Sequence, residues 1–93
     1  MKIPIVTILP IILIAAAGQV AADELETTYA ALMSDVRNTS LNLRYAHLAE
    51  DQGKLKWALP AYERALRNDP ANTDARAGLV RVRAALAAPE GSK

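Results

Sequence analysis

The fold of this chain is decided by residues 42–70, which read NLRYAHLAEDQGKLKWALPAYERALRNDP. Apolar side chains recur there at helical spacing in two runs, which Gly53 separates. The first run begins one residue earlier and places Leu41, Tyr45 and Leu48 at i, i+4 and i+7. The second run is longer and contains Leu55, Ala58, Leu59, Tyr62, Ala65 and Leu66. Because alanines in both runs allow two helices to approach closely, the stretch predicts an antiparallel helical hairpin that stacks on another hairpin.

The same residues resemble a tetratricopeptide repeat (TPR), a helix–turn–helix unit with small and aromatic residues at fixed places and a closing proline. With the repeat placed at residues 39–72, six sites agree with the family pattern: Ala46, Gly53, Ala58, Tyr62, Ala65 and the closing Pro70. Two sites depart from it, because Asn42 and Ala49 stand where the family favours tryptophan and tyrosine. These departures predict a thinner core along the first helix. The resemblance implies an all-α fold of antiparallel helical hairpins stacked as a short TPR-like solenoid.

A shift by one repeat length extends the pattern in both directions. Upstream, a stripe at i, i+4, i+7 and i+11 is formed by Leu25, Tyr29, Leu32 and Val36. Downstream, Thr73 is expected to cap a helix with a similar stripe, formed by Ala75, Leu79, Val82 and Leu86. We therefore expect a TPR-like helical domain over residues 23–88, arranged as half a repeat, a whole repeat and either half a further repeat or a capping helix. Residues 89–93 are expected to form a flexible tail.

Residues 1–22 belong to a different class of segment. A basic start at Lys2 precedes an apolar run over residues 5–17, and small residues end at Ala22 before acidic Asp23. This is the layout of a secretory signal peptide cleaved after Ala22. The alternative is an uncleaved membrane anchor, since residues 3–22 carry no charge and are long enough to span a bilayer. The first reading predicts a periplasmic or exported protein, and the second predicts an inner-membrane anchor that leaves the helical domain in the periplasm.

Charge and composition limit the partners. The chain has no cysteine, which excludes disulfides and lipoprotein processing. Residues 23–51 carry six acidic and two basic side chains, and residues 52–93 carry four acidic and eight basic ones, so the halves have net charges of −4 and +4. The sum of zero gives no electrostatic support for nucleic-acid binding. The uneven distribution could steer self-association or the approach of a polar protein partner, although it also fits an ordinary solvated helix surface.

Five residues are candidates for partner binding. In TPR proteins the first helix of each repeat lines a concave groove, so the resemblance implies a binding face with Leu43, His47 and Glu50, joined by Arg81 from the last helix. Such a face suits a peptide or a helical segment. Trp57 is the fifth candidate, because it lies off the core stripe of its helix. It either anchors an interface or folds back over the helix at residues 29–36 to fill a gap.

No pattern points to catalysis, to a metal or to a cofactor. His47 is the only histidine, and without cysteine it lacks the further ligands that a metal site needs. It is better explained as a surface residue in local ion pairs with Glu50 and Asp51. No serine stands in a nucleophile frame, and no glycine-rich phosphate loop is present. The sequence predicts a protein that is not an enzyme.

Two functions remain open. The first is a non-catalytic interaction module, a TPR-like adaptor that helps assemble or stabilise a protein complex in a bacterial-type cell envelope. The second is a membrane-anchored accessory subunit whose N-terminal helix is retained, with possible membrane contact through residues 3–22. A weaker third possibility is that the chain is a piece of a longer repeat protein.

Overall fold

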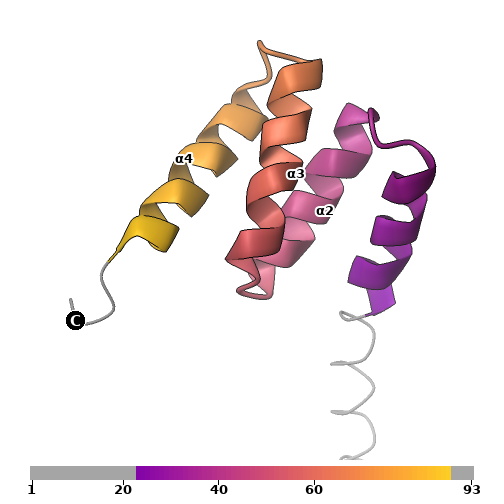
Figure 1. Cartoon of the computed structure of the whole chain (residues 1–93), viewed down its shortest axis with the longest axis horizontal. Helices are drawn as coiled ribbons and strands as arrows, with labels where there is room; N and C mark the ends of the chain where they lie inside the picture. Colours follow the sequence, from indigo (N-terminus) through magenta and orange to yellow (C-terminus); the bar gives the residue numbers. More distant parts are fainter. Residues whose placement is uncertain (1–22, 89–93) are drawn as a thin grey trace, which may run out of the picture.

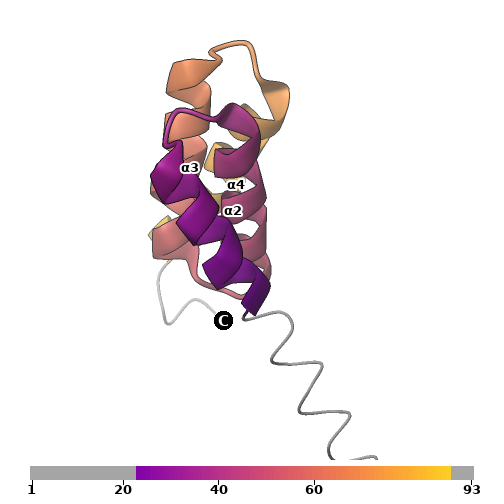
Figure 2. The same cartoon turned by 90° about the vertical axis from the view of Figure 1, so that its right-hand side faces the viewer.

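The computed structural model describes residues 23–88, and all regular secondary structure in this part of the chain is helical. A helix at residues 23–34 precedes α2 (Thr39–Asp51), α3 (Leu55–Asn68) and α4 (Thr73–Ala87). Each helix lies beside the next one in the chain and runs in the opposite direction (Figure 1 and Figure 2). The all-α prediction is confirmed, and the predicted hairpin corresponds to α2 and α3.

The predictions for residues 1–22 and 89–93 lie outside the described residues. They concern the signal peptide, its alternative as a membrane anchor, and the tail. Within residues 23–88, no helix combines the length and the hydropathy that crossing a membrane requires.

Two equivalent caps begin α2 and α4, at Asn38 and at Asn72, 34 residues later. Each asparagine side chain accepts a hydrogen bond from the backbone N–H three residues later, at 2.9 and 2.8 Å. Each amide also donates at 3.2 Å to an aspartate three residues earlier, Asp35 or Asp69. The backbone angles agree as well, with φ −73° and ψ 111° at Asn38 and φ −72° and ψ 110° at Asn72. The prediction of Thr73 as the cap was therefore wrong by one residue.

Gly53 makes the turn between α2 and α3, as predicted. Its φ of +76° is a left-handed conformation that glycine adopts without steric cost. The N–H of Gly53 donates to the Glu50 carbonyl at 3.0 Å, and the N–H of Lys54 donates to the Ala49 carbonyl at 2.8 Å. This pair of bonds is a Schellman motif, which satisfies carbonyls at the end of α2 and turns the chain into α3.

The core of the hairpin is built on small side chains. Ala46 and Ala49 of α2 and Ala58, Ala61 and Ala65 of α3 are completely buried. Their size lets the two helix backbones approach closely. Larger residues close the core, namely Leu25 and Leu32 from residues 23–34, Tyr45 from α2, Tyr62 from α3, and Leu79 and Val82 from α4.

Asn42 was predicted to thin the core along α2, but it is a buried polar residue whose hydrogen bonds are all satisfied. It is completely buried. Its Nδ2 donates to the backbone carbonyls of Val36 and Asn38, both at 2.9 Å, and its Oδ1 accepts from Arg64 Nε at 2.8 Å. The buried face of α2 is thus centred on Asn42, Tyr45, Ala46 and Ala49, whereas Leu41 and Leu48 are only partly buried. Since every hydrogen-bonding atom of the amide group is used, Asn42 ties α2 to α3 and to the preceding turn.

The two outer stripes are only partly buried. Tyr29 remains about half exposed, because the buried face of residues 23–34 passes through Leu25, Thr28 and Leu32. Val36 is also about half exposed, because it lies in the turn after this helix and not on the helix as the stripe predicted. Leu86, the last residue of the α4 stripe, is also exposed. The first stripe therefore leaves Tyr29 available on the surface.

Candidate functional site

The five predicted binding residues do not form one site. His47, Glu50 and Arg81 meet in a polar cluster that also contains Tyr62 and Asp74, which we call the Tyr62 cluster. Leu43 is partly buried and packs against the hydrophobic core. Trp57 lies apart from both and lines a groove. Three of the four residues predicted for the concave face thus lie together, but their side chains are engaged with one another.

The Tyr62 cluster links three helices through one hydroxyl group. Tyr62 of α3 donates a hydrogen bond to Glu50 of α2 at 2.7 Å. Arg81 of α4 donates a hydrogen bond to each oxygen of the same carboxylate, from Nε at 2.8 Å and from Nη2 at 2.9 Å. The Arg81 Nη2 also lies 3.3 Å from the Tyr62 hydroxyl. His47 places Nδ1 2.9 Å from that hydroxyl and Nε2 3.0 Å from the Asp74 carboxylate.

The ion pairs differ from those predicted for His47. The local pairs with Glu50 and Asp51 do not form, and the imidazole instead reaches Asp74 on α4. The His47 ring also meets the Tyr62 ring edge-on, with centroids 5.4 Å apart. His47 therefore links α2 to α4 and not one turn of α2 to the next.

The charges in the cluster fix its protonation. The two hydrogen bonds from Arg81 lower the pKa of the Glu50 carboxyl from 4.5 to about 2. Burial, reinforced by Glu50, raises the pKa of the Tyr62 hydroxyl well above 10, and the Glu50 carboxylate raises the pKa of Arg81. At neutral pH the hydroxyl therefore donates, the carboxylate accepts and the guanidinium stays charged. This arrangement holds α4 against the hairpin.

Gly78 makes room for this arrangement on α4. A methyl group at this position would overlap the ring of Tyr62, so the ring packs directly on the helix backbone. Tyr62 is completely buried and cannot move aside without moving its hydroxyl from Glu50. The cluster and the packing of the ring are therefore one unit.

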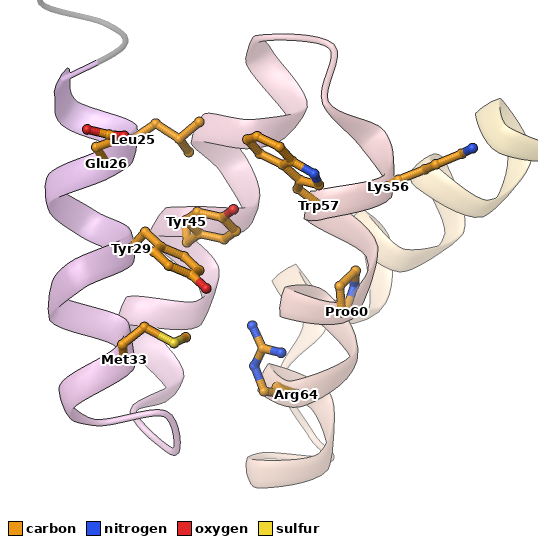
Figure 3. A pocket seen from close by; sticks show the side chains of 9 residues that line it. All are labelled: Leu25, Glu26, Tyr29, Met33, Tyr45, Lys56, Trp57, Pro60 and Arg64. Atoms are coloured by element: carbon orange, nitrogen blue, oxygen red, sulfur yellow. The ribbon is translucent and has the colours of Figure 1, made fainter.

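An aromatic groove lies between residues 23–34 and α3, with α2 as its floor (Figure 3). Its volume is about 480 Å³. We call it the aromatic groove; nine residues line it, namely Leu25, Glu26, Tyr29, Met33, Tyr45, Lys56, Trp57, Pro60 and Arg64. The volume falls within the range of ligand-binding clefts, and six of the nine lining residues are aromatic or aliphatic.

Three large side chains in the groove remain half exposed. The exposed fractions are 48% for Tyr29, 47% for Met33 and 51% for Trp57. The Tyr29 ring lies 5.5 Å from that of Tyr45, and the Lys54 ammonium lies 4.7 Å from the centre of the Trp57 ring. Trp57 thus faces the helix at residues 23–34 across the groove and still presents half of its surface to solvent, and its role as an interface anchor stays a prediction.

Sequence reasoning missed most of the groove. The sequence placed Tyr29 only on the apolar stripe of its helix and indicated no role for Met33 or Arg64. A signal was present, since Tyr29 and Met33 follow the buried Leu25 at i+4 and i+8, next to the buried Thr28 and Leu32. Periodicity could not predict the second wall of the groove, because that wall is formed only when α3 packs opposite residues 23–34.

Neither the grouping of potential metal ligands among the described residues nor the comparison with known proteins adds a site to these two. Within residues 23–88, no three side chains of His, Cys, Asp or Glu are grouped so that they could hold a metal ion. Comparison with protein-family models, curated proteins and solved structures finds no match for this chain.

The Tyr62 cluster predicts a specific dependence of stability on pH. Because the pKa of Glu50 is lowered by folding, its contribution is complete above pH 4.5 and is lost as the pH falls towards 2. We expect Glu50→Gln to lower the free energy of unfolding by about 1 kcal/mol at pH 7 and to have almost no effect near pH 2. Urea unfolding followed by circular dichroism at both pH values measures this difference.

The matched control is Glu63→Gln, which removes a longer ion pair with Arg83 of 3.4 Å. Glu63→Gln should lower the free energy of unfolding at pH 7 by less than Glu50→Gln does. A Glu50→Gln effect that is the same at both pH values would contradict the assignment.

Proposed function

We propose that this chain is a non-catalytic protein-interaction module, a TPR-like adaptor that binds a segment of a partner protein in the aromatic groove. The observation that carries the proposal is the group of half-exposed Tyr29, Met33 and Trp57 side chains along one continuous groove. Tryptophan, tyrosine and methionine are enriched at the centres of protein interfaces. A polar solvent-facing surface has no need for three such residues at one place.

The TPR-like solenoid is supported by the repeat of structural detail. The caps at Asn38 and Asn72 share their hydrogen bonds and backbone angles, and their separation in the chain equals the repeat length of the family. The glycine turn and the buried alanines at 46, 58 and 65 also agree with the family pattern.

We interpret α4 as the capping helix of the array. Asn42 and Ala49 are buried in α2, and the positions one repeat length after them are Arg76 and Arg83, both exposed. Arg76 bonds to the Pro70 carbonyl and Arg83 pairs with Glu63, and a further helix packed over them would have to bury both guanidinium groups.

The aromatic groove is a better binding surface than the face implied by the resemblance. Glu50 and Arg81 satisfy each other, and His47 is held by Tyr62 and Asp74. A ligand at that face would have to break these contacts before it gained any. By contrast, the apolar side chains of the groove lose only water when a ligand covers them.

We further propose that the module acts in the cell envelope, either as an exported adaptor or as an anchored accessory subunit. This rests on the sequence of residues 1–22, which lie outside the described part of the chain. The positive start, the apolar run and the small residues before Asp23 support export in both cases.

Intact mass of the chain from native cells separates the two forms. Cleavage after Ala22 predicts a species that begins at Asp23 in the soluble envelope fraction, and an anchor predicts a species that retains residues 1–22 in the membrane fraction. A full-length species in the cytoplasmic fraction would contradict both.

The groove is tested by site-specific photo-cross-linking in native cells. A photoreactive residue in place of Met33 should cross-link to a defined partner protein, because the bound partner covers that side chain of the groove. Once the partner is identified, Trp57→Ala should weaken its binding at least tenfold, as expected for a buried aromatic anchor. Isothermal titration calorimetry measures this change.

Val80 provides the control, since its exposed fraction is 65% and it lies on α4 outside the groove. A photoreactive residue there should give no specific product, and Val80→Ala should leave affinity unchanged. Equal cross-linking from both positions, or full affinity in Trp57→Ala, would refute the proposed function.

A further inference from the structure

Arg64 directs a positive charge into the aromatic groove (Figure 3). It extends from α3 towards the helix at residues 23–34, and the Tyr29 hydroxyl points towards it from the facing wall (Figure 3). Glu26 and Lys56 also line the groove, but their charged ends point away from its middle (Figure 3). Among the charged residues that line the groove, Arg64 is therefore the one that points towards its middle (Figure 3).

Asn42 holds this guanidinium in place. The Arg64 Nε donates at 2.8 Å to Oδ1 of Asn42, which is itself fixed by two backbone carbonyls. Arg64 is partly buried. Because Nε is already used, a ligand can reach only the two terminal nitrogens, Nη1 and Nη2. Their fork matches the two oxygens of a carboxylate, which would bind end-on with little further loss of side-chain freedom.

Arg64 is not engaged in an ion pair with another described residue. The nearby Tyr45 remains an uncharged phenol, since burial raises its pKa. An unpaired, partly desolvated arginine attracts a carboxylate more strongly than an exposed one does.

We propose that the aromatic groove takes an amphipathic helical segment of a partner protein, in which an Asp or Glu side chain binds Arg64 and a neighbouring large apolar side chain packs among Tyr29, Met33 and Trp57. This inference rests on the proposed function and specifies the chemistry of the partner. The wall formed by Leu25, Tyr29 and Met33 spans eight residues, or about 12 Å, which is two turns of a helix. A helix laid along it presents anchors at i, i+3 or i+4, and i+7.

Selection from a random library of 12-residue peptides tests this chemistry on the full chain. Displayed peptides that bind the wild type but not Trp57→Ala are sequenced, and two of them are synthesised with each Asp or Glu changed to its amide. We expect the selected peptides to share one acidic residue at a fixed helical spacing from a large apolar residue. Changing that acid to its amide should weaken binding at least tenfold to the wild type.

Arg64→Gln should bind the acid and amide peptides equally, with its remaining affinity still dependent on Trp57. Arg64→Lys should retain part of the preference for the acid, because it keeps the charge without the fork. Arg67→Gln is the matched control, since Arg67 is an exposed arginine of the same helix that does not line the groove. The Arg67→Gln variant should prefer the acid peptide over the amide peptide as strongly as the wild type does. The peptide change leaves the protein unaltered, so the test holds even if Arg64→Gln folds poorly.

Each other result has a definite meaning. Selected peptides without a shared acid, or a preference for the acid that persists in Arg64→Gln, would overturn this inference and leave the proposed function standing. If no peptide depended on Trp57, both would fall. A wild-type dimer, seen by light scattering and absent in Trp57→Ala, would show that a second copy fills the groove and would also overturn the inference.

Discussion

The arrangement of α2, α3 and α4 depends on where one tyrosine ring can lie. Tyr62 is completely buried, and its ring packs against the backbone of α4 where Gly78 leaves no side chain in the way. That position brings the hydroxyl 2.7 Å from Glu50 on α2. Glu50 then accepts both hydrogen bonds from Arg81 on α4. A side chain of α3 thereby sets the distance and the register between the two helices that flank it, and His47 and Asp74 add a second bridge nearby.

This constraint divides the surface into two parts with different roles. The face with Glu50 and Arg81 is occupied by contacts that keep the helices together, so its charges are compensated inside the chain. The aromatic groove has the opposite character, because Trp57 and its neighbours are half exposed and Arg64 is held in place without an ion pair among the described residues. Asn42 connects the two roles. It belongs to the core of the hairpin, and it also orients the one charged group that points into the groove.

Periodicity was enough to predict the hairpin, its glycine turn and the all-α fold, because these depend on neighbours within one or two helical turns. It failed for residues whose partners are distant in the chain. The sequence indicated that Asn42 weakens the core, since local spacing does not reveal its hydrogen bond with Arg64, 22 residues later. Tyr62 was correctly assigned to the core, but its hydroxyl meets Arg81, 19 residues later, and Glu50, 12 residues earlier. The groove was missed for the same reason, since its two walls come from helices that only packing brings together.

The packing of Tyr62 on α4 is tested most directly by Gly78→Ala. At an unconstrained site inside a helix, alanine stabilises by about 1 kcal/mol relative to glycine. Here the added methyl group would displace the Tyr62 ring, so we expect Gly78→Ala to lower the free energy of unfolding in the wild type, measured with urea. In a Tyr62→Ala background, where the ring is gone, the same change should raise it. A gain of about 1 kcal/mol in both backgrounds would contradict the account, because it would show that α4 does not pack on this ring.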